Sequence, residues 1–186
     1  MRIIAGAFRG KKIIPPEDKK TRPLKDLVKE SIFNIINHSN KLSSKIEDAI
    51  ILDLFSGVGT FGLESLSRGA KFVTFVEKYV KVLSILKKNL DNLKLINKFD
   101  IIEEDILENF DNIKFNHTFD IIFIDPPYKE NDINQILNII INKKILKNEG
   151  IIIIHRHKKE LNNFPEQLKI IEEKKYGIAK IIFAKI

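Results

Sequence analysis

The sequence contains no cysteine, and it has no apolar run long enough to cross a membrane. The absence of cysteine excludes disulfide bonds, thiolate-zinc sites and cysteine nucleophiles. A membrane-spanning helix needs about 20 apolar residues, and the first residues, MRIIAGAFRGKK, also lack the apolar stretch of a signal peptide. We therefore expect a cytoplasmic protein that makes no contact with a membrane.

The composition is that of a soluble globular protein with an excess of positive charge. Hydrophobic residues make up 44% and charged residues 31% of 186 residues, which suits one domain with a small appendage. The net charge is +7, and residues 1–30 hold nine Lys or Arg against four acids. This concentration favours nucleic acid as a partner of the N-terminal region. The alternative is a general bias toward Lys, Ile and Asn, with lysines scattered over solvated surfaces.

Residues 1–37 are expected to form an extension of a main domain that spans residues 38–186. Apolar pairs on either side of two glycines predict a short hairpin over residues 1–14, followed by a polar, proline-bounded linker. A helix is predicted from residue 24 to 37, because apolar side chains recur there at helical spacing. These side chains are Leu24, Leu27, Val28, Ile32 and Ile35.

The main domain alternates between strand and helix patterns. Helices are predicted at residues 59–69, 78–93 and 133–146, and strands at 49–55, 71–77, 98–105, 118–125 and 150–157. Residues 168–186 predict an antiparallel hairpin that turns at Tyr176–Gly177. This order is typical of an α/β, Rossmann-like fold with a mostly parallel sheet covered on both faces. Ligands of such sheets bind beyond the carboxyl ends of the strands, so the residues found there are the candidates for function.

The first two strand ends carry a nucleotide-binding pattern with an unusual acid. Gly57, Gly59 and Gly62 have the spacing G-x-G-x-x-G, and Glu77 follows where an acid commonly accepts hydrogen bonds from ribose. Asp53 precedes the loop, where it would repel a pyrophosphate by about 4 kcal/mol at 4 Å if the effective dielectric constant is near 20. The same carboxylate would attract the α-ammonium of S-adenosylmethionine. The pattern therefore favours the methyl donor over a dinucleotide.

The third strand end offers an acceptor for the adenine amino group. Asp105 is our choice, with Glu103 and Glu104 as close competitors, and a capping or solvent-facing acid is the alternative. The predicted cofactor site thus consists of Asp53, Phe55, Ser56, Gly57, Gly59, Glu77 and Asp105.

The fourth strand ends in Asp125, Pro126, Pro127 and Tyr128, which we predict to be the catalytic residues. Proline fixes φ and biases the preceding residue toward extended backbone, so the Asp125 carboxylate and the Pro126 carbonyl point in fixed directions. Two rigid acceptors can orient the exocyclic amine of a nucleobase for in-line attack on a methyl carbon, without a metal. Tyr128 would stack on the extruded base, a contact worth about 1–3 kcal/mol.

These motifs, which extend over nearly the whole chain, resemble those of known enzyme families. DLFSGVGTFGLESLSRGA with DPPY resembles the class I, S-adenosylmethionine-dependent amino-methyltransferases. RIIAGAFRGKKI followed by RPLKDLVKESIFNII is similar to the RsmD family of 16S ribosomal RNA (guanine-N2)-methyltransferases. The chain differs from the family's usual pattern at Leu24, Leu27 and Lys29, where threonine, arginine and arginine are usual.

The resemblance implies methyl transfer to one guanosine of small-subunit rRNA within a partly or fully assembled subunit, by a protein that we expect to be a monomer. It also implies that the 24–37 helix lies over the cofactor and that the N-terminal hairpin grips RNA. The expected phosphate contacts are Arg2, Arg9, Lys11, Lys12, Arg22 and Lys25.

Other readings stay open. DPPY serves adenine-N6 and cytosine-N4 methyltransferases equally well, although DNA enzymes usually carry a recognition module for which we expect no room here. An NAD-dependent oxidoreductase can share the glycine spacing, and a non-catalytic RNA-binding factor can keep the fold. His155 and His157 share a strand face, but no third ligand is evident, so we expect a polar or RNA-facing role rather than a metal site.

Overall fold

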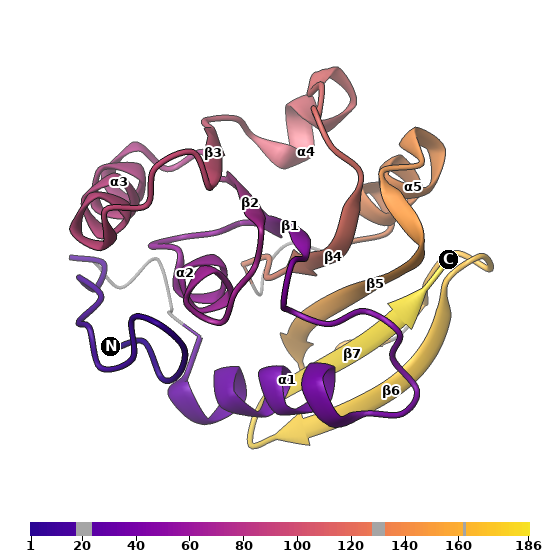
Figure 1. Cartoon of the computed structure of the whole chain (residues 1–186). Helices are drawn as coiled ribbons and strands as arrows, with labels where there is room; N and C mark the ends of the chain where they lie inside the picture. Colours follow the sequence, from indigo (N-terminus) through magenta and orange to yellow (C-terminus); the bar gives the residue numbers. More distant parts are fainter. Residues whose placement is uncertain (18–23, 128–132, 162) are drawn as a thin grey trace.

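The computed structural model describes residues 1–17, 24–127, 133–161 and 163–186, and it is organised around one seven-stranded sheet (Figure 1). The strands lie in the order β3-β2-β1-β4-β5-β7-β6, and β7 runs antiparallel to both of its neighbours while the other pairs of the main sheet are parallel. The strands are β1 (Ile50–Leu54), β2 (Phe72–Val76), β3 (Phe99–Ile102), β4 (Phe119–Ile124), β5 (Leu146–His157), β6 (Lys169–Tyr176) and β7 (Ala179–Lys185). The predicted Rossmann-like fold with an antiparallel C-terminal hairpin is confirmed.

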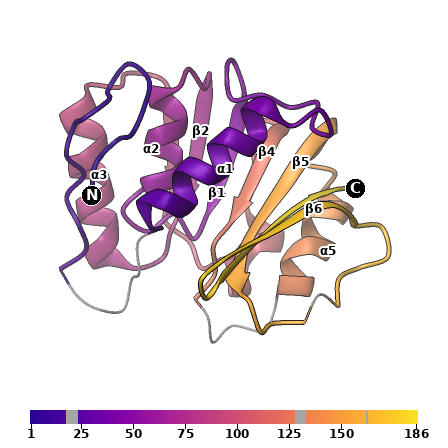
Figure 2. The ribbon, with the colours of Figure 1, turned by 90° about the horizontal axis from the view of Figure 1, so that it is seen from below.

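Helices cover both faces of this sheet (Figure 2). One face carries α1 (Asp26–His38), α2 (Thr60–Ser67) and α3 (Val80–Leu93), and the other carries α4 (Ile106–Asn109), the 3₁₀ turn η1 (Phe110–Asn112) and α5 (Ile133–Lys143). Strand residues alternate between the two layers, as in β1, where Ile51 packs under α1–α3 and Leu52 packs toward α5. No helix in the described part of the chain is long and apolar enough to span a bilayer.

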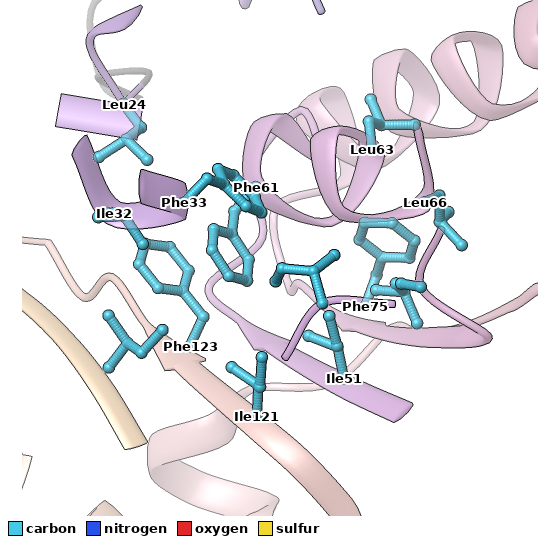
Figure 3. Packing of buried hydrophobic residues seen from close by; sticks show 14 of the residues in the cluster. Leu24, Ile32, Phe33, Ile51, Phe61, Leu63, Leu66, Phe75, Ile121 and Phe123 are labelled. Carbon is cyan, nitrogen blue, oxygen red and sulfur yellow. The ribbon is translucent and has the colours of Figure 1, made fainter. Parts of the chain in front are cut away.

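An aromatic stack joins the N-terminal helix to the centre of the sheet (Figure 3). Phe33 of α1 stacks on Phe61 of α2 with ring centroids 5.1 Å apart, and Phe61 stacks on Phe123 of β4 at 4.1 Å. All three rings are essentially inaccessible to solvent. Because Phe123 lies two residues before Asp125, this stack fixes α1 and α2 against the strand that carries the predicted catalytic residues.

The N-terminal segment is only partly the hairpin that its sequence predicts. Its antiparallel pairing is limited to one bridge, between Arg2 and Lys12, and the residues between them form turns. Backbone hydrogen bonds still join its two arms, from Ile3 N to Lys11 O, from Gly10 N to Ile3 O and from Ile13 N to Met1 O. The segment also bonds to α2: Ala7 N donates to Ser67 O, and an added Cβ at Gly6 would meet that oxygen at 1.8 Å. The close approach to α2 therefore explains the glycine at position 6.

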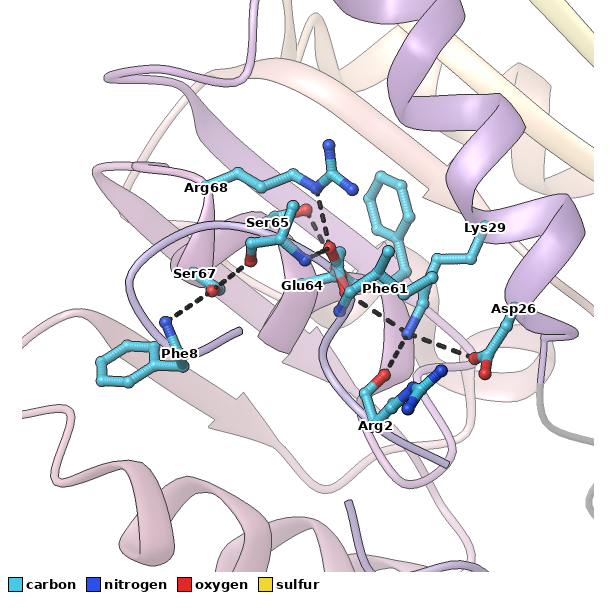
Figure 4. Close-up of polar contacts among 11 residues, drawn as sticks. Arg2, Phe8, Asp26, Lys29, Phe61, Glu64, Ser65, Ser67 and Arg68 are labelled. Carbon is cyan, nitrogen blue, oxygen red and sulfur yellow. Dashed lines mark hydrogen bonds and ion pairs between the residues drawn. The ribbon is translucent and has the colours of Figure 1, made fainter. Parts of the chain in front are cut away.

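Glu64 of α2 ties the same segment to the domain (Figure 4). Its fully buried carboxylate accepts hydrogen bonds from Ile4 N at 2.8 Å and Ala5 N at 2.9 Å. Lys29 Nζ of α1 lies 3.3 Å from the same carboxylate and donates to Arg2 O at 2.9 Å, and Arg68 Nε binds it at 2.8 Å. One acid thus joins the N-terminal segment, α1 and α2.

The predicted helix at 24–37 is confirmed as α1, but the prediction that Leu27 belongs to its buried apolar face is wrong. The buried face contains Val28, Ile32 and Phe33, whereas Leu27 is 70% exposed. Lys29, by contrast, lies on the inner face, where its Nζ is 3.3 Å from the buried carboxylate of Glu64.

Candidate functional site

The glycine-rich loop connects the carboxyl end of β1 to α2 in a strained backbone conformation. Phe55 has φ of 59°, which is unusual for a bulky residue, and Gly59, at the N-cap of α2, has φ of 85°. Gly62 has a different role, because a Cβ there would meet the Phe75 ring at 2.2 Å. The third glycine of the pattern therefore allows α2 to pack closely on the sheet.

Asp53 lies beneath this loop, 1% exposed, and its Oδ2 accepts a hydrogen bond from Gly62 N at 3.0 Å. Burial raises the pKa of Asp53 well above its ordinary value, against the Gly62 hydrogen bond, and the charges of Asp125 and Glu77 raise it further. Three carboxyl groups from β1, β2 and β4 thus influence one another at the carboxyl edge of the sheet. A cation bound among them would lower the pKa of Asp53 again.

Glu77, at the end of β2, organises the loop from the other side. Its Oε2 accepts a hydrogen bond from Gly57 N at 2.8 Å, and its Oε1 accepts from Lys78 N and Tyr79 N, both at 2.9 Å. Ser56 donates its hydroxyl to Val76 O at 3.0 Å. The loop amides that face the phosphates in a dinucleotide site are thus partly occupied by the chain's own carboxylates, Glu77 at Gly57 and Asp53 at Gly62.

Asp105 is the N-cap residue of the short helix α4, which is the alternative role to an adenine contact. Its Oδ1 accepts from Leu107 N at 2.9 Å, and its Oδ2 accepts from Lys78 Nζ at 2.7 Å. Burial opposes ionisation, but the hydrogen bonds from Lys78 and Leu107 prevail, and the pKa of Asp105 is lowered. Its competitors are exposed, and Glu103 contacts Lys87 while Glu104 accepts from Asn109. An adenine contact by Asp105 stays a prediction.

The acid-proline corner follows β4 directly. Pro126 is buried, Pro127 is exposed, and Tyr128 lies outside the described residues. The side chain of Asp125 is 21% exposed, and its Oδ1 lies 2.7 Å from Nδ1 of His155 on β5. Burial lowers the pKa of His155, but the Asp125 charge and hydrogen bond outweigh it, so the pKa is raised.

The pairing of His155 with Asp125 was missed by sequence reasoning, which considered the histidine only beside His157. A signal was available, since both apolar strands end at the same edge of a parallel sheet. In the structure Ile124 pairs with Ile154, so the residues that follow them, Asp125 and His155, are neighbours. His155 is 7% exposed and contacts Asp125, so it has the polar role that the sequence predicts.

Five of the six predicted phosphate contacts are described, and all five are exposed: Arg2, Arg9, Lys11, Lys12 and Lys25. Arg22 lies outside the described residues. None of the five forms an ion pair with another described residue, although Lys11 Nζ lies 5.2 Å above the Phe8 ring. The turn around Arg9 lies at the C-terminal end of α2, where Phe8 N donates to Ser67 Oγ at 3.0 Å. Because α2 begins at the carboxyl edge and has eight residues, this turn lies about 12 Å from that edge along the helix axis.

A shallow polar hollow of about 280 Å³ lies at the opposite, amino edge of the sheet. Three of its charged groups are engaged within the chain: Asp120 accepts from Ile50 N and from Lys147 Nζ, both at 2.8 Å, and Glu149 pairs with Lys185. The carboxyl edge, rather than this hollow, carries the buried acids and the rigid corner that chemistry requires.

Comparison with known proteins shows the family of this chain. A family model described as "Conserved hypothetical protein 95" matches residues 1–185. Ribosomal RNA small subunit methyltransferase D of Haemophilus influenzae is 35% identical, with 96% of this chain and 90% of that protein covered. The Escherichia coli K12 protein of the same name is 32% identical, with coverage of 83% and 73%. The solved structure of Escherichia coli yhhF has a TM-score of 0.84 at 30% identity, with coverage of 99% and 96%. The chain belongs to this family, the RsmD family of methyltransferases.

Proposed function

We propose that the carboxyl edge of the sheet binds S-adenosylmethionine and that the chain transfers its methyl group to the N2 amine of one guanosine in small-subunit rRNA. The observation that carries the proposal is the convergence of Asp53 and Glu77 on the glycine loop, next to the rigid corner at Asp125. A site with this much negative charge suits a ligand that carries an ammonium and a sulfonium.

The same observation argues against an NAD-dependent oxidoreductase. A pyrophosphate needs free loop amides and a positive helix N-terminus, but Gly57 N and Gly62 N donate to carboxylates of the chain. The buried Asp53 would add repulsion. A non-catalytic RNA-binding factor would have no need for an acid-proline corner beside these acids and this loop.

The proposed chemistry needs little beyond positioning. S-adenosylmethionine supplies an electrophilic methyl carbon attached to a sulfonium. The Asp125 carboxylate and the Pro126 carbonyl accept hydrogen bonds from the amine and turn its lone pair toward that carbon. As the new N–C bond forms, the C–S electron pair returns to sulfur, and the amine passes a proton to Asp125. Tyr128 is proposed to stack on the base.

Guanine N2 is favoured by the family to which the chain belongs, since adenine N6 and cytosine N4 present the same kind of amine to the corner. The decisive experiment incubates purified protein with the methyl donor and rRNA, in free and subunit-bound form, and analyses the digested nucleosides by mass spectrometry. We expect N2-methylguanosine. N6-methyladenosine or N4-methylcytidine would replace the proposed substrate with one of the alternatives, and no transfer to any substrate would refute the function.

The N-terminal extension is proposed to hold the RNA backbone. Its exposed cations at Arg9, Lys11 and Lys12, which form no ion pair with another described residue, lie on an element that Glu64 fixes to the domain. The distance of about 12 Å from this surface to the catalytic edge is short compared with a folded RNA. A single RNA can therefore contact both places at once.

Replacing Arg9, Lys11 and Lys12 together by glutamine is expected to weaken RNA binding and to leave cofactor binding unchanged. If all three contact phosphates, the slope of log affinity against log salt should flatten by about 2 to 3. Filter binding at several salt concentrations measures the slope, and calorimetry measures cofactor affinity. The matched control replaces Lys114, Lys144 and Lys169, which are exposed and lie away from the N-terminal segment. An equal effect of both triple variants would refute a specific RNA surface.

A further inference from the structure

His155 contacts the residue on which the proposed chemistry depends. Its Nδ1 lies 2.7 Å from Oδ1 of Asp125, and both side chains are largely buried, with 9% and 21% exposure. Within the described part of the chain, Oδ2 of Asp125 has no hydrogen-bonding partner. The two oxygens of this carboxylate are therefore not equivalent, because one is held by the histidine and the other is available.

We propose that His155 is a positioning residue that fixes the Asp125 carboxylate so that Oδ2 faces the substrate amine. The inference rests on the proposed methyl transfer, since it assigns the histidine a role in that same site. An acceptor that rotates freely presents either oxygen in many directions, whereas a carboxylate bound at Oδ1 presents Oδ2 in one.

The support beneath His155 is rigid. Strand β5 lies between β4 and β7, and His155 pairs in register with Ile181, which is fully buried. Its neighbour Ile154 pairs with Ile124 of β4. Because strands inside a sheet are held on both sides, the ring is fixed relative to the corner at Asp125, which also donates its backbone N–H to Leu54 O at 3.4 Å.

His155 also balances charge at the site. Asp125 and Glu77 raise the pKa of Asp53, so the corner collects negative charge before any ligand is bound. The charge and the hydrogen bond of Asp125 raise the pKa of His155, which favours an imidazolium that donates from Nδ1 to Asp125. A protonated histidine has no lone pair for the proton that the amine loses. This favours positioning over a role as general base.

The test compares three substitutions that differ in where they place a donor. Asn places its amide nitrogen at the position of Nδ1, Gln places it one bond farther out, and Leu has no donor. We expect His155→Leu and His155→Gln to lower kcat about 10- to 100-fold. His155→Asn should stay within about 5-fold of wild type. KM for RNA and the cofactor affinity should change less than about 3-fold in all three variants, because His155 itself is proposed to contact neither RNA nor the cofactor. His117→Leu, which removes a ring contact with Phe72 far from the corner, is the control.

Crystal structures of the same variants give a readout that does not need activity. In His155→Leu the Asp125 side chain is expected to leave its single conformer, and in His155→Asn to keep it. If His155→Leu does not fold, the Asn and Gln pair carries the same comparison. The variants without a donor at Nδ1 could instead keep an unchanged kcat or an unchanged Asp125 conformer. Either result would overturn the role of His155 and leave the proposed function standing. Absence of methyl transfer by the wild-type protein would overturn the proposed function, and this role of His155 with it.

Discussion

Replacing Asp125 by alanine is expected to lower kcat for methyl transfer by at least about 10²- to 10³-fold, because the substituted site loses a preorganised charged acceptor. Binding of the methyl donor should stay within a few-fold, since the proposed donor contacts lie at Asp53, Glu77 and the glycine loop rather than at Asp125. Transfer of tritiated methyl groups to rRNA measures the first quantity, and calorimetry measures the second.

The size of this effect follows from the state of the nucleophile. The lone pair of an exocyclic amine is delocalised into the base, and orientation is what makes it available to a methyl carbon. Without the carboxylate, only the Pro126 carbonyl remains to orient the amine. The truncation also removes the 2.7 Å contact between Asp125 and the buried side chain of His155.

Two further variants separate chemistry from folding. Asp125→Asn keeps the volume and one acceptor oxygen but loses the charge, so an intermediate kcat is expected. Asp120→Asn changes the same residue type on the same strand at the opposite, amino edge, where the side chain binds Ile50 N and Lys147. It should leave kcat near that of wild type. Normal methyl transfer by Asp125→Ala would refute the mechanism.

Most of the fold could be predicted because its signals are local. The parallel strands are dominated by Ile, Val, Leu and Phe, and residues of a distinct chemical character, such as Asp53 and Asp125, lie at or just after their carboxyl ends. The parallel order then places these ends at one edge. The short helix α4 was not predicted, because residues 103–112 are mostly polar and Asp105 caps the helix through contacts that the sequence pattern does not display.

What could not be predicted depends on contacts between segments far apart in the chain. The pairing of Asp125 with His155 requires the register of β4 and β5. Burial of Lys29 depends on Glu64, which lies 35 positions later in the chain. A local sequence pattern predicts that a charged residue on a helix faces solvent. Only the three-dimensional arrangement reveals that its charge is neutralised inside the protein.

Glu64→Ala is expected to lower the free energy of unfolding by about 3–5 kcal/mol, since it leaves the buried charge of Lys29 without its main partner. Two backbone N–H groups, at Ile4 and Ala5, lose their acceptor as well. For a chain of this size the loss corresponds to a fall in Tm of about 6–20 °C. Urea unfolding should show a lower midpoint at an unchanged m-value. The control is Glu30→Ala on α1, which removes an exposed acid.

A double substitution tests whether the ion pair itself is the cause. Glu64→Gln keeps an acceptor for one backbone N–H but leaves Lys29 charged, so it should destabilise the protein. Adding Lys29→Met removes that charge and should recover part of the loss, because the cost comes from an uncompensated buried ammonium. Additive effects of the two substitutions would contradict this cause.

Loss of Glu64 should also release the N-terminal segment before the rest of the domain unfolds. Ile4 and Ala5 bond to Glu64, and Lys29 reaches Arg2 O only while the carboxylate holds it in place. Trypsin should then cut faster at Arg9, Lys11 and Lys12 in Glu64→Ala than in Glu30→Ala, under conditions where both remain folded. If those sites stay equally protected in both variants, the segment is held by its other contacts, such as Ala7 N to Ser67 O. The proposed RNA surface would then not depend on Glu64.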